Sequence, residues 1–146
     1  MKKLFYIIAT ATMLVSCGNP EKKTVAVTDN TEATEQVAAP GVEVMYFHGK
    51  QRCMTCVAIE KVASKTVAEK YADGKVKFTV IDIDTPEGEP IAERYKIARS
   101  SLLVVNHNSD GTEKVENMTE KAFANARKNP DGFSTMLCDV INPMLQ

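Results

Sequence analysis

An apolar segment that ends just before two closely spaced cysteines is the feature that most limits how this chain can fold. Residues 42–47 are largely apolar, the polar residues 48–52 follow, and Cys53 and Cys56 come next with two residues between them. The near-continuous apolar run predicts a buried strand. Apolar residues then recur at helical spacing as far as Lys70, so we expect the two cysteines in the first turn of a helix.

This position predicts different roles for the two cysteines. Side chains three residues apart in a helix share a face, so Cys53 and Cys56 can form a disulfide with little backbone movement. The helix N-terminus favours a thiolate, and Arg52 and Lys50 add positive charge, so Cys53 is the expected nucleophile with Arg52 as an electrostatic aid. Cys56, one turn deeper, is the expected resolving cysteine, which attacks the mixed disulfide between Cys53 and a partner.

Other interpretations of the same residues stay open. The pair is also compatible with a static structural disulfide in an accessory subunit of a reductase system. Alternatively, two close thiolates suit a soft metal or metalloid such as copper, zinc or arsenite, with His48 as a third ligand. His107, at the end of a later strand, has no predicted partner among the cysteines.

The first residues predict export and lipidation. Lys2 and Lys3 precede an apolar stretch over residues 4–15, which is typical of a secretory signal. Leu14-Val15-Ser16-Cys17 resembles the bacterial lipobox, which implies cleavage after residue 16 and a diacylated Cys17 anchored in a lipid bilayer. We therefore expect a signal peptide over residues 1–16, a lipidated flexible tether over 17–41 and one domain over 42–146. The domain is predicted to face the periplasm in the cell envelope, with the outer membrane slightly favoured.

Turn signals and apolar spacing predict the rest of the domain. In chain order the expected elements are a strand over 76–83, a helix opening at Thr85-Pro86, a strand over 102–105, a hairpin turn at 108–111, a return strand over 112–117, a helix capped by Thr119 and running to about Lys128, and a last helix after a break at 129–132. Cys138 is expected as a small buried residue on the inner face of that last helix, and Met45, Met118, Met136 and Met144 as core residues.

Composition and charge exclude some classes of function. The chain has 146 residues, is 44% hydrophobic and 25% charged, and has a formal net charge of −1, which is typical of an ordinary globular protein. No basic run is long enough to indicate nucleic-acid binding. The chain contains no phosphate-binding loop for a flavin or nicotinamide, and no cofactor is expected.

The order of these elements and the local sequence resemble the thioredoxin superfamily. The resemblance is carried by three segments: residues 44–56, the strand 76–84 ending in aspartate, and Tyr95-Lys96-Ile97 leading into the strand 102–105. It implies an α/β fold, a three-layer α/β/α sandwich with a central mixed sheet of about four strands. A CxxC motif set between these elements is a far more specific signal than a CxxC alone.

The chain departs from the superfamily pattern at three places near the cysteines. Arg52 and Met54-Thr55 stand where the family has tryptophan and Gly-Pro, a dipeptide that tunes the reduction potential. The acid that the family buries beneath the second cysteine would fall near Met45 or Tyr46, and neither is acidic. Ser100-Ser101 align with the family's cis-proline, so a remodelled loop with a trans bond is expected there.

Residues 46–56 are also similar to a small exported thioredoxin-like family of Bacteroidetes. That family is labelled a nitrophenyl-compound nitroreductase subunit and is associated with arsenic-resistance genes. The resemblance implies a partner such as a membrane reductase. The predicted function is that of a membrane-tethered thiol-disulfide oxidoreductase that exchanges disulfides with the thiols or disulfides of envelope proteins.

Overall fold

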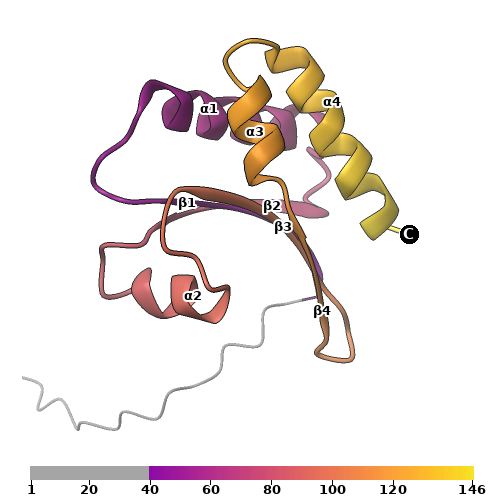
Figure 1. Ribbon diagram of the computed structural model, residues 1–146. Coiled ribbons are helices and arrows are strands. Elements are labelled where there is room, and N and C mark those ends of the chain that lie inside the picture. The colour runs from indigo at the N-terminus through magenta and orange to yellow at the C-terminus, as the bar shows by residue number, and fades with distance from the viewer. Residues whose placement is uncertain (1–39) are drawn as a thin grey trace, which may run out of the picture. The chain divides into compact units, whose positions relative to one another are not determined.

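The computed structural model describes residues 40–146 (Figure 1). The predicted signal peptide, Cys17 and nearly all of the predicted tether lie outside the described residues. The elements are β1 (Gly41–His48), α1 (Met54–Lys70), β2 (Val76–Asp82), α2 (Glu89–Arg94), β3 (Ser101–His107), β4 (Glu113–Asn117), α3 (Thr119–Asn125), α4 (Pro130–Ile141) and a short 3₁₀ helix, Asn142–Met144. Across residues 40–146 no helix combines the length and apolar character that crossing a membrane requires.

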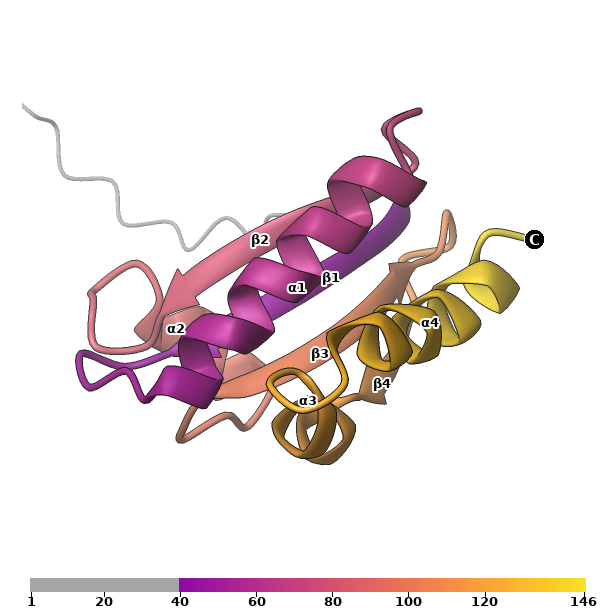
Figure 2. The same ribbon diagram turned by 90° about the horizontal axis from the view of Figure 1, so that it is seen from above.

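The four strands form one mixed sheet in the order β2-β1-β3-β4. Strand β1 pairs in parallel with β2 and antiparallel with β3, and β3 pairs antiparallel with β4. Helices α1, α3 and α4 cover one face of this sheet and α2 covers the other (Figures 1 and 2). The predicted three-layer α/β/α sandwich with a mixed sheet of four strands is therefore confirmed.

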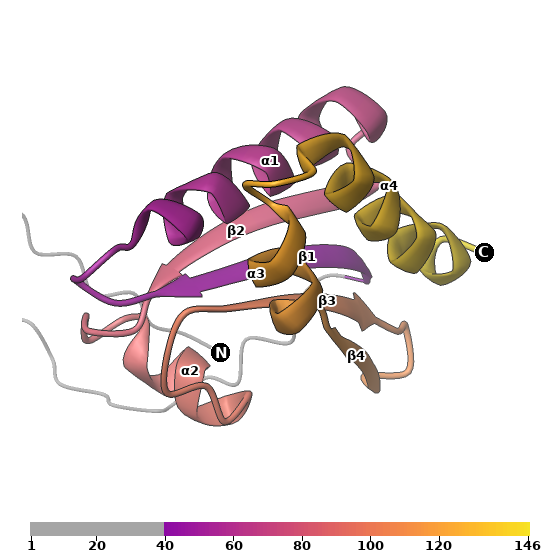
Figure 3. The same cartoon turned by 45° about the horizontal axis from the view of Figure 1, so that its top comes forward.

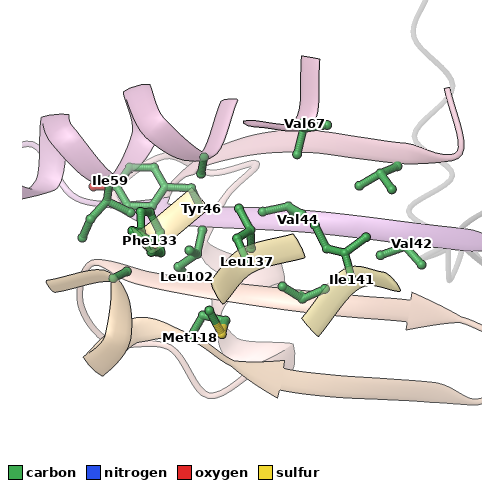
Figure 4. Close-up of a cluster of buried hydrophobic side chains, with 14 of the residues drawn as sticks. Val42, Val44, Tyr46, Ile59, Val67, Leu102, Met118, Phe133, Leu137 and Ile141 are labelled. Atoms are coloured by element: carbon green, nitrogen blue, oxygen red, sulfur yellow. The ribbon is translucent and has the colours of Figure 1, made fainter. Parts of the chain in front are cut away.

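Strand β1 is largely apolar because both of its faces are buried over most of its length. Val42, Val44 and Tyr46 point into the core beneath α1 and α4, where they meet Phe133 and Leu137 (Figure 4). The alternate residues, Met45 and Phe47, pack instead against Ile81, Leu103, Val105 and Ala92 of α2. A strand covered on both sides needs apolar residues on both faces, which explains the nearly continuous apolar run over residues 42–47.

Helix α2 begins later than the sequence indicated. Thr85 and Gly88 form successive turns instead, because the Thr85 N–H donates to the Asp82 carbonyl at 3.2 Å and the Gly88 N–H donates to the Thr85 carbonyl at 3.1 Å. A β-carbon on Gly88 would lie 2.0 Å from the Asp82 carbonyl oxygen, so only glycine permits this close approach. The helix starts at Glu89, and Ile91, expected on its inner side, is exposed.

The two C-terminal helices also differ in their limits. Thr119 does not cap α3: Met118 is the N-cap, and the Thr119 hydroxyl accepts a hydrogen bond from the Leu102 N–H at 3.1 Å. Helix α3 ends at Asn125 instead of near Lys128. The predicted break at 129–132 is the start of α4, since Asn129 caps the helix by accepting from the Gly132 N–H at 3.0 Å, and proline is well tolerated in a first turn.

Two residues of α4 are less buried than expected. Met136 is an exposed residue, whereas Met45, Met118 and Met144 are buried as predicted. Cys138 is a half-buried free thiol instead of a core residue. The buried side of α4 is formed by Phe133, Leu137 and Ile141, whose spacing of four residues follows one helical face and leaves the flanking positions 136 and 138 at the margin.

Candidate functional site

The loop between β1 and α1 is fixed to the end of β2. The His48 carbonyl accepts a hydrogen bond from the Ile83 N–H at 2.8 Å, and the Lys50 N–H donates to a carboxylate oxygen of Asp84 at 2.7 Å. Figure 3 shows this loop at one end of the molecule, beside the loop that leads from β2 to α2. The segment that carries the cysteines is thus held by the ends of two parallel strands.

Cys53 and Cys56 form a disulfide at the start of α1, with their Cα atoms 5.0 Å apart. Cys53 is the N-cap of the helix, and its Sγ accepts a hydrogen bond from the Cys56 N–H at 3.1 Å. Cys53 is exposed, whereas Cys56 is only 4% exposed. One sulfur of the pair is therefore open to a partner and stabilised by a backbone donor, and the other lies beneath it.

Arg52 lies next to the pair, but its positive charge is partly balanced by a neighbouring carboxylate. Its guanidinium forms an ion pair with Glu60 of α1 and stands 5.9 Å from the centre of the Tyr46 ring. Because Glu60 opposes the positive charge, Arg52 gives the cysteines less electrostatic support than a free cation would.

Tyr46 and Ser100 belong to the site and were not predicted from the sequence. The Tyr46 hydroxyl donates to the Cys56 carbonyl oxygen at 2.9 Å, and the Ser100 Oγ lies 3.8 Å from the Cys56 Sγ. Burial raises the pKa of Tyr46, and the positive charge of Arg52 partly offsets that rise. The sequence offered two signals, because the superfamily resemblance puts a buried acid near Met45 or Tyr46 and a cis-proline at Ser100-Ser101.

A cavity of about 400 Å³ opens beside the buried cysteine. Its lining residues are Cys56, Arg99, Ser100, Thr119, Glu120 and Phe123. Phe123 is partly exposed at this cavity, and two more apolar side chains, Met54 and Val57, are exposed close to Cys53 on the first turn of α1. The surface around the disulfide thus offers apolar contacts together with charged groups.

Ser101, at the position of the superfamily's cis-proline, is the first residue of β3. It is buried, and its hydroxyl donates to the Arg99 carbonyl at 2.9 Å. The segment beside the disulfide is therefore shaped by the hydrogen bonds of two serine hydroxyls, those of Ser100 and Ser101.

His48 does not form a metal-binding cluster with the cysteines in the described residues. Its Nδ1 lies 3.1 Å from the Gly49 carbonyl oxygen. Within residues 40–146, no three His, Cys, Asp or Glu side chains are arranged to hold a metal ion. The metal or metalloid interpretation therefore receives no support from the geometry around His48.

Cys138 lies far from the CxxC pair. It lines a small cavity together with Tyr71, whose pKa is raised chiefly by burial. Tyr71 follows the C-terminus of α1, whereas the CxxC pair stands at the N-terminus of the same helix. A helix of 17 residues separates these two ends by ~25 Å. Cys138 is therefore not a third member of the disulfide site.

The strand order and the site together define a thioredoxin-like domain. Strand β1 lies at the centre of the sheet, β3 runs antiparallel to it, and a CxxC disulfide begins the helix that follows β1.

Comparisons with known proteins found similarity to solved structures only. No protein-family model and no curated protein matches the chain. Among solved structures it is similar to a thioredoxin from Thermus thermophilus, at 15% identity over 68% of this chain and 73% of that chain, with a TM-score of 0.45. It is also similar to mitochondrial thioredoxin 3 from Saccharomyces cerevisiae in the oxidised form, at 20% identity over 73% of this chain and 82% of that chain, with a TM-score of 0.46.

Proposed function

We propose that this protein is a thiol-disulfide oxidoreductase. The observation that carries the proposal is the Cys53 sulfur, which is exposed at the N-cap of α1 and accepts the Cys56 N–H. A hydrogen bond to the charged form and the positive end of a helix both favour a thiolate. A purely structural bridge has no need of an open sulfur in this position.

The proposed exchange transfers two electrons between the CxxC pair and a protein partner. In the reducing direction, the Cys53 thiolate attacks a partner disulfide, forms a mixed disulfide and releases one partner thiolate. The Cys56 thiolate then attacks the Cys53 Sγ, which closes the internal disulfide and releases the second partner thiolate. A dithiol donor returns the pair to its reduced form, and the opposite direction oxidises a partner dithiol by the same steps reversed.

Exposed apolar side chains beside the disulfide support a protein partner. Met54 is 74% exposed and Val57 is 51% exposed, both on the turn that carries the cysteines. Apolar side chains grouped in this way at a reactive site are suited to cover a segment of polypeptide while its sulfur reacts. We therefore propose protein thiols and disulfides as the substrates.

The setting of this activity is part of the proposal and is supported by the sequence alone. The lipobox-like residues 14–17 support a lipid anchor at Cys17, and export would place the domain in the cell envelope. Similarity of residues 46–56 to the family labelled a nitroreductase subunit supports a membrane reductase as the electron-transfer partner. Labelling with a fatty-acid probe tests the anchor, because Cys17→Ser would abolish incorporation.

Serine substitutions of the two cysteines test the proposed exchange. Cys56→Ser should accumulate mixed disulfides with a protein substrate, visible on a non-reducing gel and released by dithiothreitol, because the resolving thiol is missing. Cys53→Ser should form none and should lose disulfide exchange. Cys138→Ser is the matched control and should behave as the parent. Normal turnover in both CxxC variants would reject the proposal.

The reduction potential of the pair is a second test. Equilibration of the purified protein against glutathione and then dithiothreitol gives the potential directly. Known exchange catalysts lie between about −120 and −270 mV, and structural disulfides lie below about −300 mV. A value in the first range supports exchange, and a value in the second indicates a structural bridge.

A further inference from the structure

The buried position of Cys56 raises a chemical requirement. As the resolving cysteine, it must become a thiolate while it is shielded from water, and burial in apolar surroundings disfavours the charged form. Tyr46, which occupies the expected position of a carboxyl group below Cys56, has no acid function near neutral pH because burial raises its pKa above the ordinary value. Another group must stabilise the charge on the sulfur.

The hydroxyl of Ser100 is placed to do this. Its Oγ lies 3.8 Å from the Cys56 Sγ, within hydrogen-bonding distance for sulfur. A hydroxyl is both donor and acceptor, so Ser100 can accept from the thiol and, after rotation about its C–O bond, donate to the thiolate. Hydrogen bonds to a charged group are stronger than those to a neutral one, which lowers the pKa of the thiol.

Tyr46 fixes the sulfur's side of this contact. Its hydroxyl donates to the Cys56 carbonyl at 2.9 Å. The ring is fully buried in the core beneath α1 (Figure 4), and Arg52 stands over it. A fixed phenol therefore anchors the helical turn that carries Cys56, and this turn lies beside the loop that carries Ser100.

We propose that Ser100 stabilises the Cys56 thiolate and that Tyr46 is the positioning residue that holds the turn of Cys56 beside Ser100. The inference rests on the proposed function, since the resolving role of Cys56 is what requires its thiol to ionise. In the resolving step the Cys56 proton passes to water in the adjoining cavity, and the thiolate forms a bond to the Cys53 Sγ. The bond from Cys53 to the partner sulfur breaks, and the departing partner thiolate takes up a proton.

The charged groups around Cys56 come from three other elements. Arg52 approaches from the β1–α1 loop and is paired with Glu60 of α1. Arg99, from the loop before β3, and Glu120, from α3, line the same cavity as Cys56. Arg99 favours the thiolate and Glu120 opposes it, so a test of Ser100 must separate its effect from that of Glu120.

Titration of Cys56 in the full chain provides that test. The Cys53→Ser background leaves Cys56 without its disulfide partner, and the ¹³C shift of the Cys56 Cβ reports its ionisation separately from the other cysteines. Ser100→Ala should raise the midpoint by roughly one pH unit, which corresponds to the loss of one hydrogen bond to a charged group. Ser100→Thr keeps the hydroxyl and should restore the midpoint. Ser109→Ala, in the exposed hairpin turn, is the matched control and should leave it unchanged.

The role of Tyr46 predicts a further pattern. Tyr46→Phe removes only the hydroxyl that holds the Cys56 carbonyl and should also raise the midpoint. The double variant with Ser100→Ala should shift no further than Ser100→Ala alone, since Tyr46 acts through the contact between Cys56 and Ser100. Tyr95→Phe, on the opposite face of the sheet, is the control for loss of a tyrosine hydroxyl and should leave the midpoint unchanged.

Two results would overturn the inference. The first is an unchanged midpoint in Ser100→Ala, and the second is a shift seen only in Glu120→Gln, which would assign the control of Cys56 to the carboxylate. The titration requires no turnover, so a failure of the proposed function would appear separately, as absence of mixed disulfides in Cys56→Ser. Ser100 lies in a partly exposed loop, so its variants test the inference even if Tyr46→Phe destabilises the core.

Discussion

The carboxylate of Glu43 lies 3.4 Å from the Nε2 of His107, on the face of the sheet opposite α1. The other ring nitrogen of His107 is 2.9 Å from an oxygen of Glu113, and Glu43 also contacts Thr79 and Lys77 of β2. This polar group joins all four strands. His107 is buried within this group, with only 7% of its surface exposed.

Removal of the imidazole should destabilise the sheet. His107→Ala leaves two largely buried carboxylates without a shared partner, and the expected loss is about 1–3 kcal/mol in the free energy of unfolding. Urea denaturation followed by circular dichroism measures it. Lys114→Ala, an exposed change on neighbouring β4, is the control. Equal stability of the two variants would show that His107 contributes nothing beyond its neighbours.

Tyr95 should make folding sensitive to alkali. Burial and the nearby Glu113 carboxylate raise the pKa of Tyr95 to about 12, above its ordinary value of 10.0. The unfolded chain therefore loses this proton first, so the contribution to stability is present below about pH 10 and is lost as pH rises to about 12. Stability of Tyr95→Phe should fall less steeply over that interval. Denaturant titrations at a series of alkaline pH values test this, and parallel curves would contradict it.

The exposed apolar residues of α1 should contribute to binding of a protein substrate. Met54→Ser combined with Val57→Ser removes apolar surface that a bound polypeptide would cover, and we expect a KM increase of about tenfold with little change in kcat. Steady-state disulfide exchange with a protein substrate measures both constants. Ala68→Ser, an exposed position near the other end of α1, should leave KM unaltered. An effect on kcat alone would argue against a docking role.

Arg52 and Glu60 should act on Cys53 in opposite directions. Arg52→Gln removes a cation near the sulfur and should raise the pKa of the Cys53 thiol, whereas Glu60→Gln leaves the arginine unopposed and should lower it. Each shift is expected to be ~0.5 pH unit, because both groups are partly exposed to solvent. The rate of alkylation of reduced Cys53 as a function of pH gives the two midpoints. Shifts of the same sign would disprove the electrostatic explanation.

The two faces of α4 should respond differently to truncation. Leu137 is fully buried, so Leu137→Ala should cost about 2–5 kcal/mol of unfolding free energy through lost burial and a residual cavity. Met136 is exposed, and Met136→Ala should change stability by roughly 0.5 kcal/mol or less. Thermal and urea denaturation distinguish the two, and comparable losses would mean that the helix packs differently.

Periodicity predicted the sheet well because the strands have strong local signals. The limits of β1 and β2 agree within a residue or two, since β1 is a largely apolar run and the apolar residues of β2 recur as far as a terminal aspartate. Helix starts were less predictable. Thr85-Pro86 has the composition of a helix start, but the close approach of Gly88 to the Asp82 carbonyl delays α2, and that approach depends on tertiary folding.

The site was only partly accessible from sequence for a similar reason. The spacing of Cys53 and Cys56 and their place at a helix start are local properties, and the structure shows them as expected. Tyr46 and Ser100 meet Cys56 only because β1 and the loop before β3 converge on the first turn of α1. Contacts between residues so far apart in sequence follow from the fold and not from spacing.

The central position of β1 has a consequence for the order of folding. Among the elements of residues 40–146 this strand is made first, yet it pairs on one side with β2 and on the other with β3, where His107 lies opposite Gly41. Contacts of such sequence separation form slowly, whereas the cysteines, three residues apart, can meet at once. The disulfide can therefore close in the unfolded chain, so oxidation of the pair need not wait for the sheet.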